Sequence, residues 1–232
     1  MYNSYIHRWR AFMIIYHGSE YIIDKPVLGG GRSHNDYGSG FYCTEHPDIA
    51  REWSVTSEHD GYLNIYDFDV SDLKILNLNK YPVMTWLAVL LDNRTFEVTA
   101  PLAREAKTYI LNEFLIDYSS YDVIIGYRAD DSYFSFAQDF ISGVISYEQL
   151  GEAMMLGELG NQFVLKSAEA FNHIRYTGSE KVFRKSWLPQ KESRDRKARA
   201  DYSSMDKKYI RGSLYVIRII EEEMKKDDNR LR

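Results

Sequence analysis

Apolar residues recur along the chain at two spacings, which predict an alternation of strands and helices. Short runs that are wholly apolar, or in which apolar and polar residues alternate, predict strands. Apolar positions every three or four residues predict helices. The expected strands are residues 14–16, 62–69, 73–78, 123–127 and 162–166. The expected helices are residues 46–56, 82–91, 103–115, 132–143, 146–156 and 212–226. These elements indicate a fold of the α+β class.

Two of the expected helices begin with capping signals. Thr44 is expected as the N-cap and Pro47 as a first-turn residue of the helix at 46–56. Ser146 and Gln149 match the capping-box pattern, in which each side chain satisfies the other residue's backbone N–H. Both signals predict the start of a helix from the local sequence alone.

The composition indicates one core. A chain of 232 residues, 44% hydrophobic and 15% aromatic, is long enough to bury a single sizeable core. A net charge of -5 gives no general attraction to nucleic acid. The single Cys43 rules out an internal disulfide, and no apolar run has the length of a signal peptide or a membrane span. We therefore expect a cytoplasmic protein with no membrane association.

Three segments are expected along the chain. Residues 1–12 are interpreted as an N-terminal extension, which leaves Met1 and Met13 both open as the native start. Residues 13–183 form the main domain, and residues 184–232 a basic segment followed by a helix that packs on the core. The basic side chains of that segment are typical of a solvated helix face, although a phosphate-bearing partner stays open.

The candidate chemistry lies near the start of the chain. A short buried strand delivers His17 at its end, and Gly18, which lacks a Cβ, allows a flat ligand to approach the backbone closely. A planar amide would bond to that backbone, and the second ring nitrogen of His17 would reach a ribose hydroxyl. Further along, Gly38 and Gly40 allow a tight bend that presents the ring of Tyr42 for stacking.

These segments, with the later strand at 162–166, resemble in order the ADP-ribosyltransferase superfamily, and most closely the bacterial proteins grouped as domain of unknown function 3990. The resemblance covers most of residues 13–183. It implies split β-sheets around an NAD cleft with flanking helices, and a reaction in which ADP-ribose passes from NAD to an acceptor. The implied cofactor-binding residues are His17, Gly18, Ser19, Gly40, Tyr42 and Trp53.

The resemblance also implies a role for each residue. His17 would orient the adenosine-side ribose, Gly18 would hold the carboxamide, and Tyr42 would stack on the nicotinamide. Trp53 follows Tyr42 by eleven residues, close to three helical turns, so it is expected either beside the same cleft or in the core.

The third catalytic position departs from the superfamily's pattern. Where the superfamily typically has Glu, the matching strand offers Gln162, a neutral amide that holds a hydroxyl but supplies no full negative charge. Glu158 is expected as a solvated loop carboxylate, with a supply of charge to the site as the alternative. Asp130 and Asp131 are expected as caps of the helix at 132–143. The alternatives for them are a general base toward the acceptor and an electrostatic substitute for the missing Glu. His17, Tyr42 and Gln162 are therefore the expected catalytic residues.

The resemblance implies a mono-ADP-ribosyltransferase with NAD as co-substrate. Its acceptor would be an unknown protein or nucleic acid, and a small antitoxin-like protein partner would suit a toxin role. An NAD-binding module without transferase activity and a protein-interaction domain are the alternatives. The six histidines and Cys43 lack the spacing of metal ligands, so no metal is expected.

Overall fold

The computed structural model describes residues 12–31, 33–128, 131–156, 160–205 and 207–231. The strands within these ranges are β1 (Phe12–Ser19), β2 (Phe41–Cys43), β3 (Gly61–Asp69), β4 (Ile75–Asn77), β5 (Val123–Tyr127), β6 (Asn161–Leu165) and β7 (Ile174–Val182). They form two sheets. Sheet A has the order β1-β3-β7 and is antiparallel, whereas sheet B has the order β2-β6-β5-β4 and contains one parallel pair, β4 with β5. The expected α+β class is confirmed.

The described helices are α1 (Pro47–Ser54), α2 (Val83–Asn93), α3 (Pro101–Phe114), α4 (Asp131–Ile141), α5 (Tyr147–Met154), α6 (Ala168–Asn172), α7 (Arg184–Ser204) and α8 (Val216–Glu221). Two 3-10 turns lie at Leu78–Lys80 and Asn229–Leu231. The expected capping box is present, because Ser146 Oγ accepts from the N–H of Gln149 at 3.3 Å and Gln149 Oε1 accepts from the N–H of Ser146 at 2.7 Å. The strand expected at 123–127 also matches β5 residue for residue.

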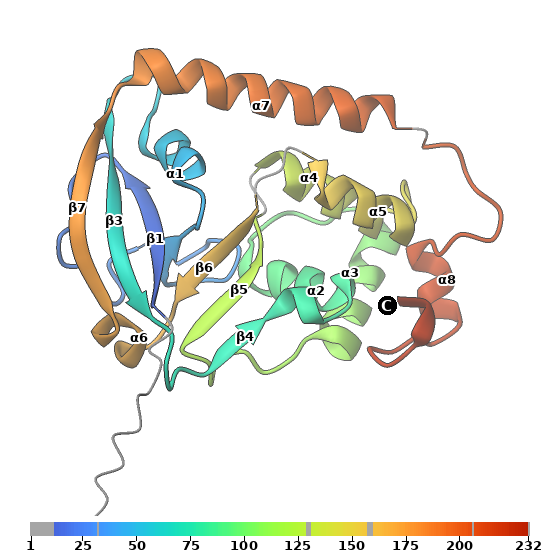
Figure 1. Ribbon diagram of the computed structural model, residues 1–232. Coiled ribbons are helices and arrows are strands. Elements are labelled where there is room, and N and C mark those ends of the chain that lie inside the picture. The colour runs from blue at the N-terminus through green and yellow to red at the C-terminus, as the bar shows by residue number, and fades with distance from the viewer. Residues whose placement is uncertain (1–11, 32, 129–130, 157–159, 206, 232) are drawn as a thin grey trace, which may run out of the picture.

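The two sheets pack against each other, and α2 to α5 lie on the side of sheet B that faces away from sheet A (Figure 1). The core between the sheets is formed by Ile15, Phe41, Cys43, Tyr66, Phe68, Val123, Phe163 and Leu165. Helix α1 packs on the other face of sheet A through Ala50, Val55, Leu63 and Val182. Helices α2 to α5 and α8 cover sheet B, and residues 84–91 of α2 are all buried. Burial on every side explains why this helix is apolar all round rather than on one face.

A single backbone bridge joins β1 to the segment after β2. The N–H of Tyr16 donates to the carbonyl of Thr44 at 2.8 Å, and the N–H of Thr44 donates back at 2.9 Å. The expectation that Thr44 is the N-cap of the next helix is therefore wrong: its backbone is held in this bridge. His46 occupies the cap position instead and makes no side-chain cap bond. Pro47 lies in the first turn as expected.

Some elements differ from the sequence expectation. β2 and β7 were not expected as strands, since β2 has three residues and β7 is largely polar and exposed. The helix expected at 212–226 is confined to α8, which starts after Tyr215. Val216 and Ile219 are its buried residues, whereas Ile217 is 43% exposed.

Gly18 sets how closely α1 approaches β1. A Cβ at this position would lie 1.8 Å from the carbonyl oxygen of Ala50, so α1 would have to move. Gly18→Ala is therefore expected to lower the free energy of unfolding by about 3 kcal/mol, or roughly 6 to 12 °C in Tm. Gly151→Ala is the matched control, because nothing lies within 4 Å of its Cβ position and the change favours the helix by roughly 0.5 to 1 kcal/mol. Equal Tm values for the two variants in thermal melts would contradict the close approach of α1 to Gly18.

Candidate functional site

A cavity of about 850 Å³ opens between the two sheets and α7. Its lining comes from β1, the segment between β1 and β2, β2, α1, the residues after α2 and β5, β6, and α7. Of the residues expected in a cofactor site, those that line this cavity are His17, Gly40, Tyr42, Trp53 and Gln162. Gly18 and Ser19 are not among its lining residues. Asp130 and Glu158 lie outside the described residues, and Asp131 is the first residue of α4.

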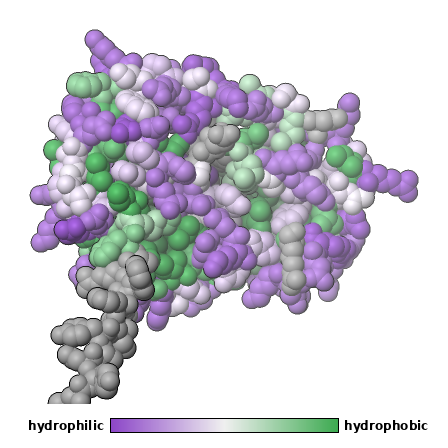
Figure 2. Space-filling model, in the orientation of Figure 1, coloured by the Kyte–Doolittle hydropathy of each residue, from purple (hydrophilic) through white to green (hydrophobic). Residues whose placement is uncertain are grey.

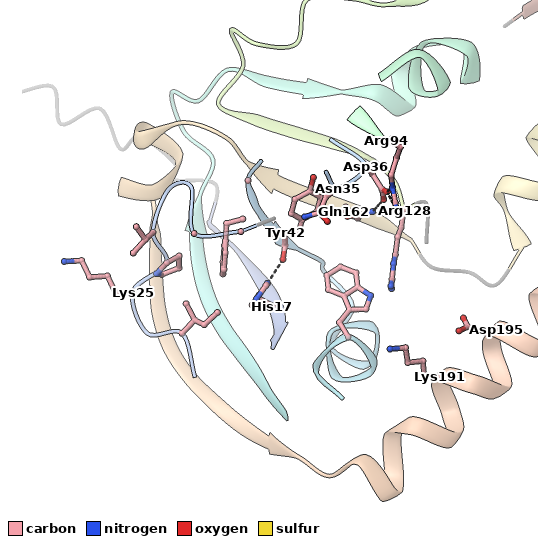
Figure 3. Close-up of a pocket in the computed structure, with 18 of the residues that line it drawn as sticks. His17, Lys25, Asn35, Asp36, Tyr42, Arg94, Arg128, Gln162, Lys191 and Asp195 are labelled. Atoms are coloured by element: carbon pink, nitrogen blue, oxygen red, sulfur yellow. Dashed lines mark hydrogen bonds and ion pairs between the residues drawn. The ribbon is translucent and has the colours of Figure 1, made fainter. Parts of the chain in front are cut away.

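His17 has a defined tautomer. Its Nδ1 lies 2.6 Å from the carbonyl oxygen of Tyr42 (Figure 3). Because a carbonyl only accepts, Nδ1 carries the proton and Nε2 is left as an acceptor. Burial lowers the pKa of His17, and the hydrogen bond to Tyr42 only partly opposes this effect. His17 thus offers a neutral acceptor of the kind that a ribose hydroxyl requires.

Gly18 and Ser19 follow His17 on β1, and their polar groups point in different directions. Tyr16 uses its N–H and C=O in the bridge to Thr44, and backbone direction alternates along a strand. The N–H and C=O of Gly18 therefore also point away from β3. The Ser19 hydroxyl donates to the carbonyl of Tyr21 at 2.5 Å and accepts from Asn64 Nδ2 at 2.9 Å. Ser19 thereby fixes the turn after β1.

Tyr42 fixes the glycine turn with its hydroxyl. The hydroxyl donates to the carbonyl of Gly38 at 2.6 Å and accepts from the N–H of Tyr37 at 3.1 Å. Gly38 has φ of 73°, which few residues other than glycine adopt easily. A Cβ at Gly40 would lie 2.5 Å from Val164 Cγ1, so this glycine lets β2 approach β6. The ring of Tyr42 is thereby positioned against the cavity by bonds at its own hydroxyl.

Gln162 belongs to a buried polar cluster. Its Nε2 donates to Asp36 Oδ2 at 2.8 Å, and Arg94 donates through Nε and Nη2 to Asp36 Oδ1 at 2.9 and 2.7 Å. Gln162 is 4% and Asp36 5% exposed. An ionised carboxylate only accepts, so the amide group of Gln162 must face Asp36 with its nitrogen. Its carbonyl oxygen is left as the acceptor.

Sequence reasoning missed Asp36 and Arg94 as members of the site. Asp36 was visible as the first residue of the glycine turn, but a carboxylate there is also typical of turns. Arg94 follows α2 and lies 58 residues from its partner, a separation that no local pattern predicts.

The family model described as protein of unknown function (DUF3990) matches residues 13–176. The chain belongs to this family. No curated protein and no solved structure matches the chain. The DUF3990 match contains His17, Tyr42 and Gln162, and it ends within β7, before α7 begins.

Trp53 of this DUF3990 protein lies on α1 and has one ring face covered. The guanidinium of Arg128, the residue after β5, lies 4.7 Å from the centroid of the indole. Such cation–π contacts contribute about 0.5 to 2 kcal/mol. Among the described residues the buried indole Nε1 has no hydrogen-bond partner. Trp53 therefore both lines the cavity and packs against Arg128.

The lining of the DUF3990 cavity is more positive than the chain as a whole. Its cationic residues are Lys25, Arg94, Arg128, Lys191 and Arg199, against the two carboxylates Asp36 and Asp195. The whole chain carries a net charge of -5. A concave, positive surface concentrates anionic ligands. No group of three or more metal-ligand side chains occurs in the described part of the chain, and none of its helices is long and apolar enough to cross a membrane.

The lowered pKa of His17 predicts a pH-dependent loss of stability. Below about pH 6.5 the unfolded chain binds a proton at this residue that the folded protein resists, so stability falls as pH decreases through that window. At pH 5 the loss is at most about 2 kcal/mol relative to pH 7.5. In urea denaturation, His17→Gln is expected to lose less stability between these pH values than wild type. The exposed His34→Gln is the control, and an equal loss in all three proteins would contradict the assignment.

Proposed function

We propose that this protein is a mono-ADP-ribosyltransferase that uses NAD as co-substrate. The observation that supports the proposal most is the convergence of three polar side chains from separate strands on one cavity. His17 comes from β1, Tyr42 from β2 and Gln162 from β6. The excess of cationic residues around the cavity suits the diphosphate of a dinucleotide.

The proposed reaction breaks the bond between the nicotinamide nitrogen and the anomeric carbon of the ribose. The bonding electron pair leaves with nicotinamide, and an oxocarbenium-like centre develops at the carbon. A lone pair of the acceptor nucleophile forms the new bond, and the acceptor's proton passes to a base. The backbone of Gly18 would bond the carboxamide, His17 Nε2 would accept from the adenosine-side ribose, and Tyr42 would stack on nicotinamide.

Gln162 and Asp36 would share the task that one Glu performs in the superfamily pattern. The carbonyl oxygen of Gln162 would accept a hydrogen bond from the 2′-hydroxyl of the nicotinamide ribose. Asp36 lies behind it, 2.8 Å from Nε2, and places a carboxylate near the developing positive charge. Because Arg94 binds the same carboxylate, only part of that negative charge is available to the transition state. We therefore propose a slow enzyme.

The acceptor is proposed to be a protein or a nucleic acid. A toxin role with a small antitoxin-like partner, and action in the cytoplasm, belong to the same proposal. The alternative is an NAD-binding module without transferase activity. It is favoured by the neutral amide at position 162 and by the Asp36–Arg94 ion pair, which together leave no uncompensated carboxylate at that position.

Nicotinamide release from NAD tests the proposal. Gln162→Ala is expected to reduce the release rate on the order of 100-fold, because a preorganised contact to the reacting ribose is lost. NAD affinity, measured by calorimetry, should change far less. Asn161→Ala is the matched control, since Asn161 is the neighbouring residue of β6 and binds Asn79 instead. Wild-type protein that binds NAD without releasing nicotinamide would support the NAD-binding module. Wild-type protein that binds no NAD would support a protein-interaction domain instead.

Two changes at Tyr42 separate its ring from its hydroxyl. Tyr42→Phe keeps the ring but loses two hydrogen bonds, so the free energy of unfolding should fall by about 1 to 3 kcal/mol with NAD affinity nearly unchanged. Tyr42→Ala should weaken NAD binding as well, because the stacking surface is lost. Thermal melts and calorimetry measure the two effects. Equal affinity losses in both variants would show that the hydroxyl, not the ring, contacts the ligand.

A further inference from the structure

Helix α7 runs from the side of sheet A to the helical side of the molecule (Figure 1), and its residues line part of the cavity. Lys191, Asp195 and Arg199 line the cavity and are spaced four residues apart, so they lie on one face of the helix. Figure 3 shows Lys191 and Asp195 on the same side of α7, toward the site. The cavity therefore has one wall that comes from a charged helix.

The position of α7 is fixed on both sides of the cavity. On the sheet A side, Arg194 lies 2.9 Å from Glu52 of α1, whose side chain is 4% exposed. On the helical side, the Tyr202 hydroxyl donates to Asp139 of α4 at 2.5 Å, and its ring lies 3.9 Å from that of Phe136. Loss of Arg194 would leave the buried carboxylate of Glu52 without its ion-pair partner, at a cost in free energy of folding. The contacts at both sides therefore hold α7 with its lining residues toward the cavity.

The cations in the central turns of α7 fall into two groups. Arg194, Arg196 and Lys197 form ion pairs, the last two with Glu192 and Asp201 on the solvent side. In the described part of the chain, Lys191 and Arg199 form no ion pair, although Asp195 lies four residues from each. The unpaired cations of the central turns of α7 are thus the two that line the cavity.

The two cations come from different turns of α7. Lys191 and Arg199 are eight positions apart, which is about 12 Å along the helix axis, and both have long side chains that can reach into the cavity. Two linked phosphate groups offer each cation its own anionic partner, which a single phosphate does not. Arg128 adds a third cation at the end of β5, and Glu52 lies near both it and Lys191.

We propose that Lys191 and Arg199, with Arg128, form a subsite for the diphosphate group of a nucleotide. The inference rests on the proposed function in that NAD is a dinucleotide with this group. The subsite would be supplied largely by residues beyond the DUF3990 match, which ends at residue 176, whereas His17, Tyr42 and Gln162 lie within it. Binding of the nucleotide and activation of the ribose would then depend on separate parts of the chain.

Calorimetric titration of the full chain with ADP, AMP and adenosine tests the subsite. The double variant Lys191→Gln/Arg199→Gln is expected to bind ADP about tenfold more weakly than wild type, with adenosine affinity unchanged. The control is Arg196→Gln/Lys197→Gln, which removes the same net charge from the exposed face of the same helix. It should bind ADP within about twofold of wild type, because exposed charges at a distance are screened. Circular dichroism checks that each variant is folded.

The subsite is overturned if the Lys191/Arg199 variant binds ADP as wild type does, if the control loses as much affinity, or if wild type binds ADP no better than adenosine. Nicotinamide release separates this result from the proposed function. ADP binding that depends on Lys191 and Arg199, without cleavage of NAD, would retain the subsite and reject the transferase. Cleavage of NAD with an unchanged KM in the Lys191/Arg199 variant would retain the transferase and reject the subsite.

Discussion

The two hydrogen bonds between Tyr16 and Thr44 determine how the rest of the site is arranged. They join β1 of sheet A to the residue that follows β2 of sheet B, with lengths of 2.8 and 2.9 Å. His17 comes directly after one partner and Tyr42 lies two residues before the other, so the bridge fixes their relative position. The bond from His17 Nδ1 to the Tyr42 carbonyl then sets the tautomer. One backbone contact between the sheets thus sets the relative position of His17 and Tyr42, from which the tautomer of His17 follows.

Local signals in the sequence predicted the elements that depend on local physics. β5 is a short strand that begins with three β-branched residues, and the capping box at Ser146 is a reciprocal pair of bonds within one turn. β7 could not be predicted in this way, since its residues are polar and its strand character comes from pairing with β3. Thr44 has the side chain of a good N-cap, but its backbone is needed in the bridge between the sheets. Tertiary contacts overrode the local preference in both cases.

The candidate site was predictable only in part for the same reason. His17 follows one predicted strand, Gln162 begins another, and Tyr42 follows the predicted glycine bend. The structure brings all three to one cavity. The charges that surround them are contributed over long distances in the chain. Asp36 and Arg94 are 58 residues apart, and Asp36 and Gln162 are 126 apart. A sequence pattern contains no information on such pairs, although they orient the Gln162 amide and decide how much negative charge the site presents.

Helix α7 shows how a segment that looks solvated can belong to a site. Most of its residues are charged or polar, and the hydrophilic upper edge of the molecule follows its course (Figure 2). A polar helix has little apolar surface with which to pack, so its position here depends on a few specific contacts. The Glu52–Arg194 ion pair and the Tyr202 contacts with α4 provide these on opposite sides of the cavity. Because both anchors lie on parts of the core that also line or flank the cavity, any shift of α1 relative to α4 would also move the charged wall that α7 contributes. The position of the charges that α7 contributes to the cavity therefore depends on how α1 and α4 are placed relative to each other.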